Sequence, residues 1–269
     1  MQINSSNNSA LSSFRANVQN TIRQSSQRLS SGLRINSAAD DAAGLAISKG
    51  LEAQIRSLNQ GTRNALDMDS ALRTADSGLS GMSEGLIRIR ELALQASNGT
   101  LSSADRQNIQ AEVNQQLSQI QNAARNTQFN TMQLLDGSFA DMNMASNPDG
   151  SGMTISIANT TLESLGIANF DVTSGNIDLT AIDNALNAVN AARGNIGAVQ
   201  NRIEFNVQNN QTAAINLEAA RSRIADADMA REASRLEQAR VLQQYQNFAF
   251  NNKLDGMRRR AAFIGIAFN

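Results

Sequence analysis

A single heptad register runs without a break through residues 182–224 and predicts one long helix. Large residues recur every seven positions, and mostly small ones follow three residues later, which is the a/d pattern of a coiled coil. The helix would be ~65 Å long at 1.5 Å per residue. An ordinary amphipathic helix of a globular protein is the alternative, but such helices rarely exceed ~25 residues. The large positions, which we assign to an assembly seam, are Ile182, Val189, Ile196, Ile203, Asn210, Leu217 and Ile224.

The N-terminal part of the chain carries a similar seam with an eleven-residue rhythm. Its members step by 3, 4, 4, 3, 4 and 4 residues, and one member, Ser25, is polar. This period is close to that of a straight α-helix, so only slight coiling is expected. The apolar members, assigned to the same kind of seam, are Leu11, Phe14, Val18, Ile22, Leu29 and Leu33.

Two further helices are expected before the middle of the chain. Ser37, followed by two aspartates at 40–41, resembles an N-cap with an acidic first turn, which predicts the start of a second helix. That helix is expected to loosen around Gly61 and to end at Asn-Gly-Thr, residues 98–100. Ser102 or Ser103 can then cap a third helix.

Between the helical arms the pattern changes to that of a short β region. Asp136-Gly137 is a turn dipeptide, and residues 153–157 alternate like a strand. The two arms must run antiparallel to bury their seams. We therefore predict a mainly α fold: a long antiparallel coiled-coil-like helical rod with a small β-hairpin insert, and with the N- and C-terminal helices paired at one end. The predicted segments are 1–36 (N-terminal helix), 37–137 (N-terminal rod helices), 138–178 (insert), 179–228 (C-terminal rod helix) and 229–269 (C-terminal helix).

The composition excludes much of enzyme chemistry. The chain has no His, Cys or Trp, and its single proline, Pro148, lies inside the insert. Without imidazole or thiol groups we expect no catalytic residue, no metal site and no cofactor. The formal net charge of −1 provides no broad positive field for nucleic acid. No run reaches the ~18 apolar residues of a membrane span, and the N-terminus lacks the basic start and apolar core of a cleavable secretory signal.

The terminal segments have more apolar surface than they can bury within one chain. The helices before Leu29 and after Met229 are amphipathic, yet the sequence offers them few intramolecular partners. Exposed apolar surface of this kind usually marks a partner site, and self-assembly of many copies is its simplest use. A helical protein that coats lipid is an alternative from another class. The heptads favour protein partners, because a lipid face needs no seven-residue register.

Several long motifs resemble those of bacterial flagellins. Residues 27–47 read QRLSSGLRINSAADDAAGLAI and are similar to the family's N-terminal signature. Further matches are RIRELA at 88–93, NTQFN at 126–130 and ARSRIADAD at 220–228. The resemblance covers about residues 3–140 and 180–245 of this chain.

The resemblance implies a secreted structural protein that polymerises into the extracellular flagellar filament for motility. Export would occur through the flagellar type III system, and residues 1–36 and 229–269 would form the inner tube. The insert would be a reduced form of the family's variable outer region. The implied partners are further copies of the chain, the flagellar cap and junction proteins and an export chaperone. A filament-hook junction protein, which shares the terminal helices, is an alternative that the near-unbroken signature at 27–47 argues against.

The resemblance also implies recognition of the rod surface by the vertebrate toll-like receptor for flagellin. Matched motif by motif, the receptor site maps to Arg88, Leu92 and Gln95 on the second helix and to Glu112 on the third. Arg88 offers a five-donor fork, and Glu84, four residues earlier, is expected to orient it. The alternative is that Arg88 and Glu112 only keep the surface solvated.

The C-terminus, about residues 246–269, departs from the family pattern. Flagellins generally end in an apolar helix with a Val/Leu-rich finish, whereas this chain has three arginines at 258–260 followed by a short apolar tail. Three alternatives are a variant inner-tube segment, a membrane-surface anchor and sequence unrelated to the ancestral end.

Overall fold

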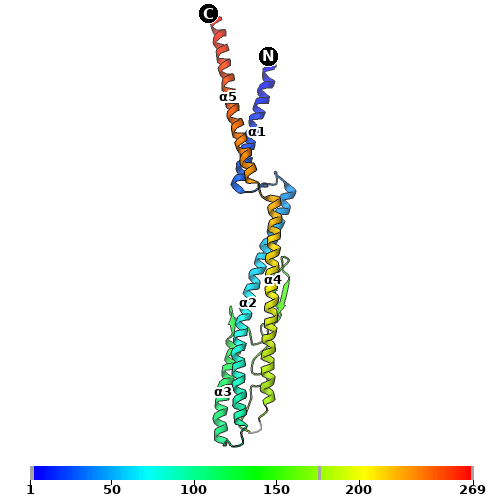
Figure 1. The fold of residues 1–269 in the computed structure, drawn as a ribbon, viewed down its shortest axis with the longest axis vertical. Coiled ribbons are helices and arrows are strands. Elements are labelled where there is room, and N and C mark those ends of the chain that lie inside the picture. The colour runs from blue at the N-terminus through cyan, green and yellow to red at the C-terminus, as the bar shows by residue number, and fades with distance from the viewer. Residues whose placement is uncertain (1–2, 175–176, 268–269) are drawn as a thin grey trace. The chain divides into compact units, whose positions relative to one another are not determined.

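The computed structural model describes the backbone of residues 3–174 and 177–267 and the side chains of residues 12–174, 177–256, 258 and 259. Helices dominate, and two antiparallel two-stranded sheets precede the fourth helix (Figure 1). The prediction of a mainly α fold with a small β insert is confirmed. The elements are α1 (Ile3–Ser31), α2 (Ala42–Ala96), α3 (Ser103–Asn126), β1 (Gln128–Phe129), β2 (Met132–Gln133), β3 (Met142–Ala145), β4 (Gly152–Ile155), α4 (Leu179–Ala225) and α5 (Met229–Ala267).

Contacts between residues divide the chain into two compact units. Residues 1–53 and 217–269 form one, which we call the terminal unit. Residues 54–216 form the other, the central unit. The helices α2 and α4 contribute residues to both.

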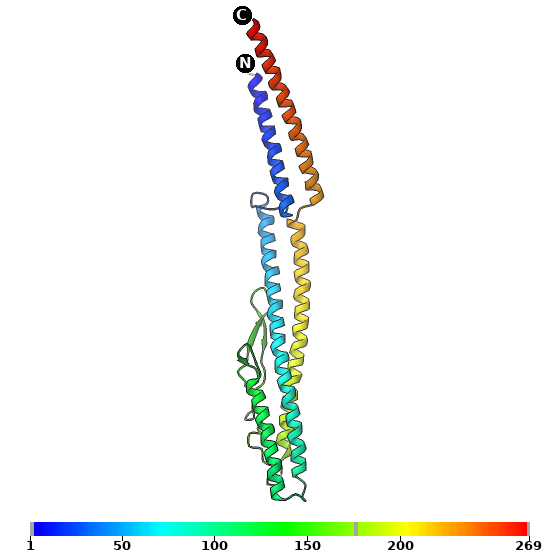
Figure 2. The ribbon, with the colours of Figure 1, turned by 90° about the vertical axis from the view of Figure 1, so that its left-hand side faces the viewer.

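In the terminal unit α1 and α5 lie side by side in both views (Figures 1 and 2), which confirms the predicted pairing of the terminal helices. α1 ends where Gly32 adopts φ +71° and its N–H donates to the Arg28 carbonyl at 2.9 Å. This left-handed cap favours glycine because glycine has no Cβ. Arg34 N–H then donates to the Ala225 carbonyl at 2.7 Å, and Ala227 N–H donates to the Gly32 carbonyl at 2.9 Å. Backbone hydrogen bonds therefore link the end of α1 to the segment that precedes α5.

The cap of α2 differs from the predicted one. Asp41 Oδ1 accepts from the Gly44 N–H at 2.8 Å, so Asp41 caps a helix that begins at Ala42. The N–H and hydroxyl of Ser37 instead donate to Asp40 Oδ2 at 2.9 and 3.0 Å. The prediction of Ser37 as the cap is wrong, because Ser37 and Asp40 close a separate turn before the helix.

α3 begins with a reciprocal capping box. Asp105 N–H donates to Ser102 Oγ at 3.2 Å, and Ser102 N–H donates to Asp105 Oδ2 at 3.0 Å. Hydrogen bonds from the Ser102 hydroxyl and N–H hold the pKa of the Asp105 carboxyl below its usual value. Of the two predicted cap residues, Ser102 is the one that the helix uses.

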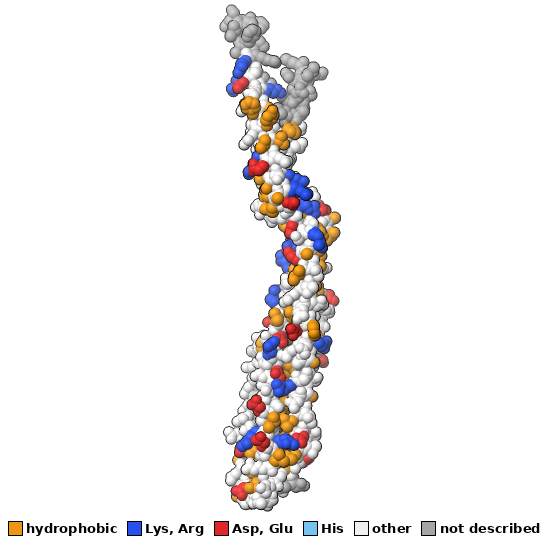
Figure 3. Space-filling model, viewed as in Figure 1, with side chains coloured by type: hydrophobic (Ala, Val, Ile, Leu, Met, Phe, Trp, Pro, Cys, Tyr) orange, Lys and Arg blue, Asp and Glu red, His pale blue; other side chains and the backbone are white. Residues whose placement is uncertain are grey.

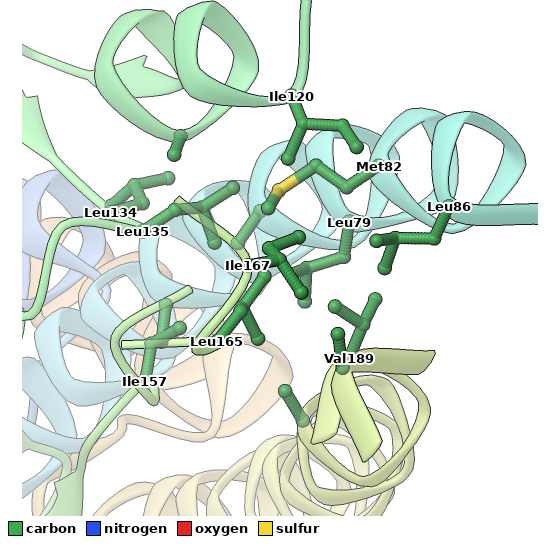
Figure 4. Close-up of a cluster of buried hydrophobic side chains, with 14 of the residues drawn as sticks. Leu79, Met82, Leu86, Ile120, Leu134, Leu135, Ile157, Leu165, Ile167 and Val189 are labelled. Atoms are coloured by element: carbon green, nitrogen blue, oxygen red, sulfur yellow. The ribbon is translucent and has the colours of Figure 1, made fainter. Parts of the chain in front are cut away.

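The core of the central unit lies where α2, α3, α4 and the segment 134–172 meet. The apolar residues of α2 recur at steps of three and four, so they bury one continuous face. Figure 4 shows side chains from the other helices and from the loop segment entering the same cluster. The labelled members are Leu79, Met82, Leu86, Ile120, Leu134, Leu135, Ile157, Leu165, Ile167 and Val189. The insert therefore lies on the helices and completes their core.

α2 continues without interruption through Gly61, where the sequence predicts a looser helix. A Cβ built on Gly61 would overlap the carbonyl oxygen of Ser146 in the β3–β4 loop. The side-chain amides of Asn64 and Asn210 hold this loop by donating to the carbonyls of Ala145 and Ser146, each at 2.9 Å. Gly61 is thus a position of close backbone approach and not a helix break.

Candidate functional site

The α4 seam residues of the central unit are buried within their own chain. Ile182, Val189, Ile196 and Ile203 are at most 3% exposed and belong to the core of the central unit. Asn210 is 4% exposed. The heptad face is covered by other parts of the same chain, so these side chains stabilise the monomer.

The seam residues of the terminal unit have mixed environments. Val18 is buried, and the half-buried members are Ile22, Leu29, Leu33, Leu217 and Ile224. Phe14 is 50% exposed, so the described part of the chain leaves much of its side chain uncovered. At this level α5 presents polar and aromatic groups to the neighbouring Arg15, which donates to Asn247 Oδ1 at 3.1 Å and lies 4.8 Å from the ring centre of Phe250. The side chain of Leu11 lies outside the described residues.

A buried carboxylate joins α1 to α5. Glu232 is 4% exposed, and its oxygens accept from the Ser25 hydroxyl at 3.0 Å, from Arg28 at 3.3 Å and from Arg235 at 2.9 Å. Burial by itself raises the pKa of Glu232, but the Ser25 hydrogen bond and the two guanidinium groups outweigh it and hold the pKa below its usual value. The carboxylate is therefore charged in the paired helices, and through Ser25 and Arg28 it links α5 to α1.

The opposite face of α5 carries an exposed apolar stripe, which we call the α5 stripe. It consists of Val241, Tyr245 and Phe248, which are 61%, 74% and 65% exposed. Steps of four and three residues place these side chains on one face, about 180° around the helix from the buried Glu232 and Leu236. The spacing is visible in the sequence, but a heptad analysis that stops at residue 224 misses it.

Arg88, Gln95 and Glu112 lie on the surface of the central unit and form what we call the Arg88 patch. Arg88 Nη2 lies 2.6 Å from Glu112 Oε1 on α3, and its Nη1 lies 3.1 Å from Glu91 Oε2. The hydrogen bonds that Arg88 donates to the Glu112 and Glu91 carboxylates raise the pKa of its guanidinium. Glu91 and Glu112, and not the predicted Glu84, therefore orient Arg88.

Leu92 departs from the predicted receptor site. It is 1% exposed and belongs to the core of the central unit, one helical turn after Arg88. A match of motifs carries no information about which face of the helix is covered by α3. The structure therefore corrects the role of Leu92 from a surface contact to a core residue beneath the Arg88 patch.

The rest of the surface is mixed in charge. On the face shown in Figure 3, lysine and arginine side chains are interspersed with aspartate and glutamate. Across the described residues, no group of three or more histidine, cysteine, aspartate or glutamate side chains is arranged to hold a metal ion. None of the helices, so far as they are described, has the length and apolarity needed to cross a membrane.

Comparisons with known proteins agree with these features. Residues 2–140 match the model of the bacterial flagellin N-terminal helical region, and residues 179–252 match that of the C-terminal helical region. The C-terminal match thus ends before the last turns of α5.

Relatives and solved structures extend the match over most of the chain. A flagellin of Halalkalibacterium halodurans is 39% identical over 84% of this chain and 85% of its own length. The flagellar filament 33 kDa core protein of Treponema phagedenis is 38% identical, covering 80% and 82% of the two chains. The crystal structure of Bacillus cereus flagellin is 31% identical, covers 55% of this chain and 88% of its own, and superimposes with a TM-score of 0.50. The chain belongs to the bacterial flagellin family.

Proposed function

We propose that the chain is a structural subunit that polymerises into a bacterial flagellar filament. Its relatives are named flagellin and flagellar filament core protein, which supports this role. Because flagellins are structural proteins, the chain is not an enzyme. The observation that carries the proposal is the α5 stripe, because the described part of the chain leaves three large apolar side chains uncovered on one helix face.

Burial of the α5 stripe would contribute a substantial free energy to self-association. Full burial of one large apolar side chain is worth ~1.5–3 kcal/mol, so covering the three residues gives ~5 kcal/mol before the losses of motional freedom. In a polymer every copy makes this contact, and its contribution is repeated along the assembly. Self-association through the outer face of α5 therefore accounts for a surface that a monomer leaves in water.

Electron microscopy of purified protein after addition of filament seeds tests the proposal. Wild-type protein should elongate the seeds into tubes, whereas Tyr245→Glu should not, because it places a charge in the middle of the stripe. Ala233→Glu is the matched control: Ala233 is exposed on the same helix but lies about 80° around it from Val241, outside the stripe. The absence of tubes from wild-type protein, or equal assembly by Tyr245→Glu, would contradict the proposal.

The proposed route of assembly is secretion through the flagellar type III system, followed by addition at the filament tip with cap, junction and chaperone proteins as partners. Two features of the chain support passage in an unfolded state. It contains no cysteine, and only 4% of its residues are aromatic. Immunoblots of culture medium should detect the chain in a flagellated host and lose it when the flagellar export system is deleted. Equal release by both strains would contradict this route.

A second candidate function is recognition of the Arg88 patch by the vertebrate toll-like receptor for flagellin. The exposure of Arg88 and Gln95 on α2, beside the half-buried Glu112 on the adjacent helix α3, supports it. In a receptor reporter assay with monomer, Arg88→Ala should signal less strongly than wild type. Arg73→Ala is the control, because Arg73 is an exposed α2 arginine that is also paired with a carboxylate. Equal signalling by Arg88→Ala and wild type would remove Arg88 from the site.

A further inference from the structure

The central unit contains an apolar cavity that its own side chains leave open. Its volume is about 280 Å³, and it lies between α2, the β1–β2 hairpin and the start of the β3–β4 hairpin. The buried side chains of Phe139 and Met144 line it together with Met68, and the 39% exposed Met132 contributes to its lining. An apolar cavity of ~150 Å³ accommodates a benzene ring, so this one has room for a phenyl group. Methionine side chains adapt to such a ring and make favourable sulfur–aromatic contacts.

The same unit exposes a phenyl group that its own core does not use. Phe205 on α4 is 71% exposed. It follows the buried Ile203 by two residues, so its side chain points about 200° around the helix from the face that packs within the chain. Phe205 therefore points away from its own core, and the described part of the chain leaves most of its ring uncovered.

Charges beside the two features are complementary. Asp67 is exposed and lines the cavity, whereas Arg202 is exposed one helical turn before Phe205. Some charged groups near these positions are paired, for example Asp69 with Arg73 and Asp76 with Arg193. Within the part of the chain that the structure describes, neither Asp67 nor Arg202 makes an ion pair. A phenyl group that entered the cavity from another molecule would bring an arginine toward a free carboxylate.

We propose that Phe205 of one copy inserts into the Met68–Met132–Met144 cavity of a second copy, with Arg202 facing Asp67. This inference rests on the proposed function, and it names a contact between central units. Phe205 and the cavity are different surfaces of the same molecule, so the contact is heterologous. After each addition one Phe205 side chain and one cavity remain free, and the contact therefore continues into a chain of copies.

Cross-linking tests the contact directly, because the chain contains no cysteine. In filaments of the double variant Met132→Cys/Phe205→Cys, a short bismaleimide should produce a ladder of dimers, trimers and larger species. Each single-cysteine variant, and the double variant kept as monomer, should give no ladder. Wild-type filaments without a ladder in the double variant would overturn this inference alone, whereas failure of wild type to form filaments would overturn the proposed function.

Assembly of point variants gives an independent measurement. Phe205→Ala should raise the critical concentration for seeded growth about tenfold, which corresponds to 1.4 kcal/mol per contact. Ile215→Ala is the matched control, because Ile215 is 70% exposed on the same helix, and it should change the value by less than about twofold. Equal effects of the two substitutions would overturn the proposal.

The charge pair is tested by reversal. Asp67→Arg and Arg202→Asp should each weaken growth, because each places like charges opposite one another in the contact. The double variant Asp67→Arg/Arg202→Asp should recover most of the wild-type critical concentration. Additive losses in the double variant would contradict the pairing. Circular dichroism of the monomers shows that each variant is folded before it is compared.

Discussion

Alanine substitution at two glycines of α2 should have opposite effects on the stability of the central unit. Alanine favours a helix interior over glycine by ~0.8–1.0 kcal/mol. Gly81 has no atom within 4 Å of a built Cβ, so Gly81→Ala should deliver most of that gain. At Gly61 the new methyl group would overlap the Ser146 carbonyl, so the β3–β4 loop must move.

The cost of moving the loop follows from the side chains that hold it. Asn64 and Asn210 would each lose a carbonyl acceptor, and a buried polar group left without a partner costs ~1–3 kcal/mol. Asn210 is buried but its amide also donates to Asn206 Oδ1 at 3.3 Å, so it loses one of two hydrogen bonds, and Asn64 is half-buried. The sum of ~2–4 kcal/mol exceeds the helix gain of ~1 kcal/mol. We expect Gly61→Ala to lower the free energy of unfolding by ~1–3 kcal/mol.

Urea denaturation followed by far-ultraviolet circular dichroism measures both effects. The midpoint should fall for Gly61→Ala and rise slightly for Gly81→Ala, with the denaturant slope unchanged in both. The two variants are matched, since each adds one methyl group to the interior of the same helix. Shifts of the same sign would refute the argument that backbone approach, and not helix propensity, decides the outcome at Gly61.

Three further predictions concern single side chains. Thr131 adopts φ +67°, which costs a β-branched residue ~1–2 kcal/mol. Thr131→Gly should therefore raise the thermal midpoint of unfolding by ~2–4 °C. A lower midpoint would contradict this prediction. Ser102→Ala removes the capping box with Asp105 and should lower the free energy of unfolding in urea by ~1 kcal/mol, whereas the same change at the next serine should have little effect. Because the pKa of Glu232 is lowered in the folded state, its contribution is complete above the pKa of the unfolded carboxyl and is lost as the pH falls through the folded pKa. Helical ellipticity of wild type should therefore exceed that of Glu232→Gln at neutral pH and approach it in acid; a constant difference at all pH values would argue against this role.

Periodicity predicts which face of a helix is buried but not what covers it. The heptads at 182–203 are buried as predicted, because the spacing of apolar residues is a local property of the helix. They are covered by α2, α3 and the segment 134–172 of the same chain, and a stripe of isoleucine and valine does not say which of these segments covers it. The segment 134–172, which fills this space, has a periodic signal only at 153–157, so its path over the helices is not predicted.

Polar contacts between residues that are close in sequence can be predicted, whereas those between residues far apart in sequence cannot. Ser102 and Asp105 are three residues apart, so the sequence contains the whole capping signal. For Arg88 the sequence suggests only partners that are close along the same helix. Glu112 is brought to Arg88 by the packing of α3 on α2, which the sequence does not reveal. From the sequence, Gly61 indicates a less stable part of the helix. Only the structure shows that the backbone of the β3–β4 loop lies close to it.

The anchoring of the β3–β4 loop has a consequence for engineering. Asn64 and Asn210 hold the carbonyls of Ala145 and Ser146, so the helices recognise the backbone of this hairpin and not the side chains at its tip. The tip itself, residues 147–150, is exposed. Exposed loop tips tolerate insertions when the flanking backbone stays hydrogen-bonded. A foreign epitope grafted between Pro148 and Asp149 should therefore be displayed without disturbing the helices, which makes the hairpin a scaffold for presenting peptides.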